Sequence, residues 1–386
     1  MSRSERAIIK SELLVWARES AGMDRDDAAH RLSVQPGRLQ AWEAGSGSPT
    51  VNQLRTAAHI YRVPLAAFFL PAAPPVFHPP VEDFRKLPGT LSQGLSSTLQ
   101  LHVRWALQRR QICLDLHEAL HEPPPVFDLI TQPDRDAETV AGVVRGRLGI
   151  GMEAQRRWHQ PDVALRNWVA AVEGIGVLIL QTRGVAVDEM RGYSIADTPL
   201  PIIVLNGQDT PAGRTFTLFH ELAHLLLRKS GVCELDVTGP RQAGTEVFCN
   251  RLAGAILVPC SELLADPAVK QHRGMAWTDA ELGALARQFG VSREVMLRRL
   301  LLAGKTTAEV YGAARSRLLA QYEKRKPIKE GKPLSPAIGV VKSVGKRFAR
   351  LVLGAYHSEH ITGNDLADYL GIRLKHLAKV EALVGM

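Results

Sequence analysis

The sequence predicts an α+β protein that is mostly α-helical and has several domains. The chain has 386 residues, more than one typical domain, and 45% of them are hydrophobic, which is enough to bury several cores. Most of the chain has helical patterns, while three short β-rich runs at residues 177–180, 191–195 and 201–205 predict a small β-sheet. We therefore expect an N-terminal five-helix domain, a central domain containing the sheet, and a C-terminal helical domain.

The composition favours a cytoplasmic protein without a membrane partner. No stretch approaches about 18 uninterrupted apolar residues, and Lys10 and Glu12 interrupt the run where a signal peptide would need an apolar core. Four cysteines without paired spacing favour a reducing compartment. The net charge of +9 suggests nucleic-acid binding, but most of it lies in residues 301–386 and little in the first 70.

Residues 8–70 predict five short helices joined by turns. We expect these helices near residues 11–20, 24–32, 36–45, 50–61 and 64–70, with Asp24 as an N-cap and Pro36 at a helix start. Two helices joined by a short turn, the second beginning with polar residues, form the helix-turn-helix arrangement. The proline-rich residues 71–91 predict an extended, semi-rigid linker.

Helical segments are expected around the β-rich runs, at residues 92–121, 137–148 and 162–174. The next helix, at residues 215–228, is apolar except for its ends and the H-E-x-x-H motif of His220, Glu221 and His224. Residues four apart share one helix face, so both histidines can bind one Zn2+ ion, with Glu221 beside them. Because three ionisable groups on a buried helix are costly without hydrogen bonds or a metal, we favour the metal site.

A catalytic zinc site needs a third protein ligand and an open fourth position. Glu246 lies on the apolar face of a second predicted helix that ends before Pro259, and Asn250 lies one turn later. Asn250 either orients a ligand by hydrogen bonding or is an ordinary core or capping amide. The downstream candidates for the third ligand are Cys233, Glu234, Asp236, Glu246, Cys249 and Cys260. Mn2+ or Fe2+ could replace Zn2+ at such a site.

Further helices are expected beyond Pro259. Residues 261–302 predict a helical cap whose last two helices resemble a second helix-turn-helix, with Ser292 as an N-cap, and we interpret them as structural. A basic segment at residues 324–332 predicts an exposed loop. Helices near residues 344–356, 363–370 and 375–384 then form a small tail, whose charge suits either DNA phosphates or an acidic partner.

The residues around the motif resemble the ImmA/IrrE family of zinc metallopeptidases. The resemblance rests on residues 205–206, 214–227, 246–250 and 256–259. It implies a zincin-like metallopeptidase domain, with His220, His224 and Glu246 as zinc ligands and Glu221 as the catalytic base. An oxyanion partner is also needed, and Tyr193 and Arg214 are our candidates for it.

Residues 32–45, with residues 48–50 and 54–58, resemble the XRE or Cro/C1-type DNA-binding domain. By this resemblance the recognition helix spans residues 35–44, with Gln35, Arg38 and Gln40 contacting bases or phosphates and Arg25 near a phosphate. The alternative is a unit that binds only protein, because the first 70 residues are nearly neutral. Paired DNA half-sites would suit a homodimer.

The two resemblances imply a DNA-binding transcriptional regulator with zinc-dependent endopeptidase activity. Its target would be a regulatory protein such as a repressor or antitoxin, in a stress response or mobile-element control, or this chain's own linker. The alternative is a transcription factor or antitoxin whose zinc domain senses or stabilises without proteolysis. We expect domains at residues 1–70, 92–303 and 304–386, with the linker at 71–91.

Overall fold

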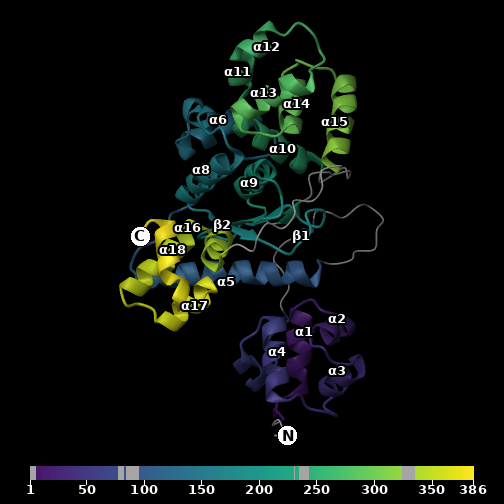
Figure 1. Ribbon diagram of the computed structural model, residues 1–386, viewed down its shortest axis with the longest axis vertical. Helices are drawn as coiled ribbons and strands as arrows, with labels where there is room; N and C mark the ends of the chain where they lie inside the picture. Colours follow the sequence, from purple (N-terminus) through teal and green to yellow (C-terminus); the bar gives the residue numbers. More distant parts are fainter. Residues whose placement is uncertain (1–5, 77–81, 84–94, 230, 234–242, 324–334) are drawn as a thin grey trace. The chain divides into compact units, whose positions relative to one another are not determined.

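The chain forms two compact units, each with its own core. The structure, a computed structural model, describes residues 6–76, 82–83, 95–229, 231–233, 243–323 and 335–386 (Figure 1). Of these, residues 6–76 and 95–108 belong to the first unit, and residues 82–83 and 109–386 to the second. Helix α5 (Ser97–Ala119) supplies residues to both units.

The first unit contains the five helices that the sequence predicts. They are α1 (Ser11–Ser20), α2 (Arg25–Arg31), α3 (Pro36–Glu43), α4 (Val51–Tyr61) and the 3-10 helix η1 (Leu65–Phe69). The Asp24 side chain caps α2 by accepting a 2.7 Å hydrogen bond from the Asp27 N–H, as expected. Their shared core includes Leu13, Leu39, Trp42, Leu54, Tyr61 and Phe68.

The second unit is built around a twisted sheet with the strand order β1-β5-β3-β4-β2. The strands are β1 (Glu82–Asp83), β2 (Leu178–Thr182), β3 (Gly192–Ile195), β4 (Ile202–Asn206) and β5 (Gly231–Cys233). β2 pairs in parallel with β4, and β3 pairs antiparallel with β4 and β5. The three predicted strands are confirmed as β2, β3 and β4. β1 and β5 were not predicted, because two or three residues carry no detectable periodicity.

Helices cover the sheet, and its central strands are apolar on both sides. α8 (Pro161–Gly174) packs on β2, and α9 (Pro211–Leu226) packs on β3 and β4. α16 (Pro336–His357) also packs on β2. Ile179 and Ile203 join the core that contains α9, while their neighbours Leu178 and Val204 face the other way and are equally buried. Strands buried on both faces explain the continuous apolar runs in the sequence.

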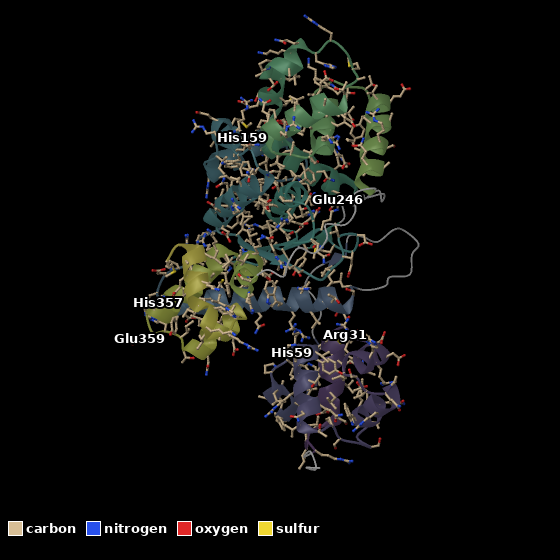
Figure 2. The ribbon with its side chains drawn as sticks, viewed as in Figure 1. Arg31, His59, His159, Glu246, His357 and Glu359 are labelled. Carbon is tan, nitrogen blue, oxygen red and sulfur yellow. The ribbon has the colours of Figure 1, made fainter. Side chains whose placement is uncertain are left out.

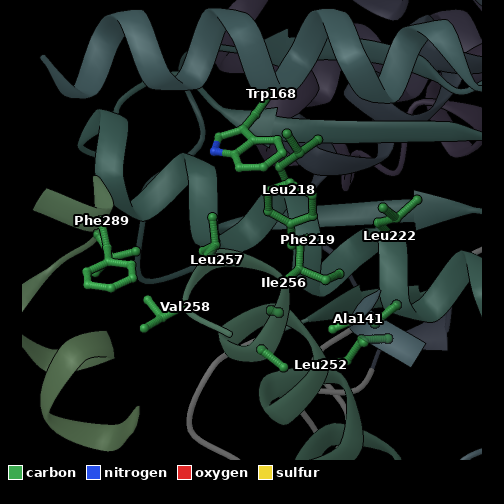
Figure 3. Close-up of a cluster of buried hydrophobic side chains, with 14 of the residues drawn as sticks. Ala141, Trp168, Leu218, Phe219, Leu222, Leu252, Ile256, Leu257, Val258 and Phe289 are labelled. Carbon is green, nitrogen blue, oxygen red and sulfur yellow. The ribbon is translucent and has the colours of Figure 1, made fainter. Parts of the chain in front are cut away.

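A large core of the second unit holds α9 against its neighbours α8 and α10 (Ala243–Leu257) (Figure 3). The Trp168 ring packs edge-on against Phe219 of α9, with ring centroids 4.9 Å apart. Leu252 and Ile256 of α10 belong to the same cluster. Close packing of this kind fixes the separation of the two helices, and therefore of the polar residues that they carry.

The remaining helices of the second unit surround this framework. α13 (Asp279–Phe289) and α14 (Arg293–Leu302) contribute Leu285, Met296 and Leu300 to the large core, and the Ser292 hydroxyl caps α14 as predicted. α15 (Ala308–Glu323) packs on α14, and α17 (Gly363–Leu370) and α18 (Leu377–Val384) pack on α16. The other helices are α6 (Ala137–Leu148), α7 (Met152–Arg156), α11 (Cys260–Ala265), α12 (Pro267–Gln271) and η2 (Leu374–His376).

Some predicted segments lie outside the described residues. These are the basic segment at 324–332 and, in the predicted linker, residues 77–81 and 84–91. The domain boundaries drawn from the sequence remain predictions. Among the helices that the structure describes, none is long and apolar enough to cross a membrane.

Candidate metal centre

The candidate site is built on α9, a helix that the structure buries along most of its length. The Thr210 side chain caps its start, accepting a 3.1 Å hydrogen bond from the Gly213 N–H, and Pro211 occupies the first turn. Residues 217–226 are all buried. His220, Glu221 and His224 therefore lie in the interior, where their interactions are with protein groups.

The structure brings His220, His224 and Glu246 together. Glu246 comes from α10 (Figure 2), and the ligand atoms that the three residues offer all lie within 4.8 Å of one another. The two Nε2 atoms are 3.2 Å apart, and each lies 3.2 Å from a carboxylate oxygen of Glu246. A tetrahedral zinc site with ligand distances of about 2.0–2.2 Å has edges of roughly 3.3–3.6 Å. The donor set and its spacing therefore fit one metal ion.

Burial and hydrogen bonding shift the pKa values of this cluster. Burial raises the pKa of Glu246, but hydrogen bonds with His220 and His224 outweigh it and lower this pKa to about 2. Burial also lowers the pKa of His224. At His220, burial lowers the pKa, but the hydrogen bond with Glu246 and nearby carboxylates bring it above its ordinary value. An ionised carboxylate and a neutral imidazole are the forms that bind a metal.

Asn250 contacts the cluster from α10, one turn after Glu246. Its Oδ1 lies 3.1 Å from His220 Nδ1 and accepts a hydrogen bond when that nitrogen carries the proton. This tautomer leaves Nε2 of His220 with its lone pair directed at the centre of the cluster. Of the two sequence interpretations of Asn250, the geometry favours the one in which it orients a ligand.

Glu221 has a partner that the sequence analysis missed. The Ser194 hydroxyl of β3 donates a 2.9 Å hydrogen bond to Glu221 Oε2, and Ser194 is completely buried. Two residues earlier, a Cβ atom at Gly192 would lie 2.4 Å from the Thr217 methyl and 3.3 Å from Cγ of Glu221. Gly192 therefore allows β3 to approach α9 closely enough for the Ser194 contact.

The two candidates for an oxyanion partner lie on β3 and near the start of α9. Since Gly192 and Ser194 face α9, strand alternation turns Tyr193 to the opposite face of the sheet. Arg214 lies seven residues before Glu221, about 10 Å along the helix, and donates a 2.6 Å hydrogen bond to Gln181 of β2. The Tyr193 assignment is therefore wrong in this structure, and the Arg214 assignment stays a prediction.

The other candidates for the third ligand are not among the grouped ligand atoms or have side chains that the structure does not describe. Cys249 is completely buried, and burial raises its pKa well above the usual value, so it behaves as a core residue. Cys260 lies near the start of α11, where its N–H donates to Glu138. The side chain of Cys233, and residues Glu234 and Asp236, are not described.

The four predicted DNA-contacting residues are exposed on or beside α2 and α3 in the first unit. Gln35 is the N-cap residue of α3, and the Arg38 guanidinium lies over the Trp42 ring, 5.6 Å from its centroid. Gln40 follows Arg38 by two residues, so the two point to different sides of the helix. Arg25 makes a 3.0 Å ion pair with Glu43, which limits its freedom to reach a phosphate.

Two regions of the chain match known family models. Residues 172–301 match the Peptidase_M78 model, described as the IrrE N-terminal-like domain, and residues 14–68 match the HTH_3 model, described as Helix-turn-helix. The first region contains α9 and α10, and therefore the whole His220, His224 and Glu246 cluster. The second contains α2 and α3. No curated protein matches the chain.

Proposed function

Because this chain joins an XRE-type helix-turn-helix domain to an IrrE/ImmA-like metallopeptidase domain, we propose that it is a DNA-binding transcriptional regulator that also hydrolyses a peptide bond in a regulatory protein. The observation that carries the proposal is the buried cluster of His220, His224 and Glu246, with Glu221 beside it and held by Ser194. A purely structural role for the motif would not need Glu221 or its hydrogen bond.

We assign the metal to the two Nε2 atoms of His220 and His224 and to the carboxylate of Glu246. Two histidines and one glutamate form a ligand set typical of catalytic zinc, and Mn2+ or Fe2+ could use the same atoms. When bound, such an ion polarises the scissile carbonyl and makes water a stronger nucleophile at neutral pH. Asn250, hydrogen-bonded to His220 Nδ1, keeps Nε2 of that histidine available to the ion.

Glu221 is the proposed general base. Its carboxylate would take the proton from the attacking water and return it to the leaving amine. The Ser194 hydroxyl fixes Oε2, which sets the direction of Oε1 and reduces the motion of a carboxylate that must transfer protons at a defined position. The burial of Glu221 excludes bulk water from this step.

The proposed partners are DNA and a protein substrate. DNA would bind at α3 through Gln35, Arg38 and Gln40, with Arg25 near a phosphate. The substrate would be a repressor or antitoxin, or this chain within its linker, in a stress response or mobile-element control. A homodimer would match paired DNA half-sites.

A second function is favoured by the burial of the cluster. His220 and His224 are completely buried and Glu246 is 2% exposed, as expected for a closed metal site. In this case the metal stabilises the fold or senses a signal, and the protein acts as a transcription factor or antitoxin without proteolysis.

The two functions are distinguished in cells that express either the wild type or Glu221→Gln. Mass spectrometry of all protein N-termini would be combined with chromatin immunoprecipitation of both proteins. The proposal predicts the same DNA sites for both, and a new N-terminus in one regulatory protein, or within residues 71–91 of this chain, in wild-type cells only. Identical N-termini with the metal present in both proteins would instead favour the non-proteolytic function.

A further inference from the structure

A cavity of about 420 Å³ lies beside the metal cluster, between the start of α9, α10, α14 and α15. α10, α14 and α15 are neighbours in the second unit (Figure 1). The cavity reaches Asn250, the hydrogen-bond partner of His220, and Phe216, whose ring centroid is 6.4 Å from that of His220. Its volume is within the range of ligand-binding sites. It is therefore placed to hold part of a substrate next to the proposed reaction centre.

Among the charged side chains that line this cavity, which we call the arginine cleft, most are cationic. Its lining contains five arginines, Arg191, Arg293, Arg298, Arg299 and Arg315, but only two carboxylates, Asp209 and Glu294. A positive charge between low-dielectric walls attracts an anionic group more strongly than the same charge on an open surface.

Protein groups already hold four of the five arginines. Arg191 pairs with Asp209 at 3.3 Å and Arg315 with Glu294 at 3.0 Å. Arg293 pairs with Asp279 at 3.6 Å and donates a hydrogen bond to Gln321. Arg299 donates to the Val258 carbonyl and pairs with Glu138. These contacts keep the walls of the cleft in place.

Arg298 is different. It lines the cleft from α14 and is half-buried, yet among the side chains that the structure describes it makes no ion pair or hydrogen bond. Glu294, one turn earlier on the same helix, is the partner of Arg315 instead. A guanidinium binds a carboxylate through two parallel hydrogen bonds, so Arg298 is the group available to an incoming acidic side chain.

Apolar side chains lie next to Arg298. Leu302, one turn later on α14, is 46% exposed, and Leu319 of α15 is 37% exposed, and both line the cleft. Val295 and Leu318 extend this apolar part. Exposed leucines beside a cation suit a peptide with an acidic residue next to apolar ones. They do not suit a DNA backbone, which would also be repelled by Asp209 and Glu294.

We propose that the arginine cleft binds an acidic residue flanked by apolar residues in the protein substrate, with Arg298 as the residue that selects the carboxylate. The inference rests on the proposed peptidase function, because it assigns the cleft to the substrate of that site. It goes further by stating the chemistry of the segment that is recognised.

Binding, rather than cleavage, tests the inference. The full-length Glu221→Gln protein would be titrated into a fluorescein-labelled peptide of alternating Leu and Glu, and into the same peptide with Gln in place of Glu. Fluorescence anisotropy should show about tenfold tighter binding of the acidic peptide, a difference of about 1.4 kcal/mol, because the guanidinium forms charge-assisted hydrogen bonds with a carboxylate and not with an amide. Arg298→Gln and Arg298→Glu should remove this preference.

The control is Arg273→Gln, which removes an exposed arginine that does not line the cleft and should leave the preference unchanged. Thermal unfolding would verify that each variant is folded, and Arg298→Lys should retain part of the preference. Equal binding of the two peptides, or an equal effect of Arg273→Gln, would overturn the proposal. So would Arg298-dependent displacement of the peptide by a DNA duplex, which would assign the cleft to phosphate. If the protein prefers the acidic peptide but the wild type cleaves no protein, the proposed role of the cleft is upheld and the proposed peptidase function is rejected.

Discussion

Glu221 and Ser194 lie 27 positions apart in the sequence but form one buried pair. The Ser194 hydroxyl is 2.9 Å from Glu221 Oε2, and both side chains are inaccessible to solvent. A buried carboxylate that must transfer a proton needs a fixed position, and a hydroxyl donor supplies it without adding charge. In the proposed mechanism, Ser194 would therefore act through Glu221 as a positioning residue.

Ser194→Ala should lower the rate of substrate cleavage by about tenfold or more, because groups that orient catalytic side chains typically contribute 10–100-fold. The metal content should not change, since the Ser194 hydroxyl donates its hydrogen bond to Glu221, which is not one of the candidate ligands His220, His224 and Glu246. Cleavage rate and metal content would be measured on the same samples. Ser343→Ala, which removes a hydroxyl bonded to the Gln181 carbonyl, is the control. An equal loss of rate in both variants would contradict the assigned role.

At the scale of elements, the site depends on how closely α9 lies to β3 and α10. Two histidines on one helix face follow from the spacing of the motif, but their distance from Glu246 depends on the packing of α9 against α10. Likewise, Gly192 sets the approach of β3. The sequence alone could indicate that the two histidines share a helix face. It could not indicate that Ser194 of β3 lies against Glu221 of α9, because no local pattern around Ser194 shows what this strand meets in the fold.

Gly192→Ala should destabilise the second unit by about 1–3 kcal/mol, the usual cost of an added methyl group in a packed interior. The new Cβ would meet Thr217, Glu221 and the Val204 carbonyl. Cleavage should fall as well, because α9 must shift. Gly142→Ala is the matched control: Gly142 lies within α6 with no atom inside 4 Å of its added Cβ, so this variant should be as stable as the wild type or more so. Urea unfolding would measure the free energy of unfolding of both variants. Similar losses in the two would refute the close approach of β3 to α9.

Glu173 makes the second unit sensitive to pH. It lies at the end of α8, 6% exposed, and burial raises its pKa to about 7 despite the nearby cations Arg347 and Arg350. In the unfolded chain its pKa is near 4.3. As the pH rises, Glu173 therefore loses its proton in the unfolded state before it does so in the folded state. Its full contribution to the free energy of unfolding is present below about pH 4 and is lost as the pH rises toward 7.

Glu173→Gln removes this ionisation. The free energy of unfolding of the variant relative to the wild type should therefore increase between pH 4.5 and pH 7, by an amount on the order of 3 kcal/mol. Urea unfolding at pH 5 and pH 8 measures it. Glu153→Gln, at a side chain that is 83% exposed, should show no such trend. A difference that stays constant with pH would show that Glu173 is ionised in the folded protein.

For the whole molecule, the sequence predicted both regions that match family models but not every contact within them. The five N-terminal helices, β2 to β4, and the helices that carry the candidate ligands were predicted, because each has strong local periodicity or a cap. Ser194, the short strands β1 and β5, and the arginine cleft were missed. They arise from contacts between segments that are far apart in the sequence, so no local sequence pattern predicts them.

The two units should act through different residues. Arg38→Ala should weaken binding to operator DNA by about tenfold, within the range for one lost base or phosphate contact, while leaving cleavage unchanged. Glu221→Gln should instead lower the rate of cleavage and leave binding to operator DNA unchanged. Electrophoretic mobility shifts with fragments recovered by chromatin immunoprecipitation would measure the DNA affinity. Loss of DNA binding in Glu221→Gln would contradict this separation.

The most direct test of the central claim is the metal content of the purified full-length protein, measured by inductively coupled plasma mass spectrometry. The cluster of His220, His224 and Glu246 predicts one metal ion per chain in the wild type and in Glu221→Gln, and a large loss in folded His224→Ala and Glu246→Ala. Asn250→Ala should bind the metal about 10–100-fold more weakly. Equal metal content in the wild type and both ligand variants, or no metal in a folded wild type supplied with zinc, would contradict the account.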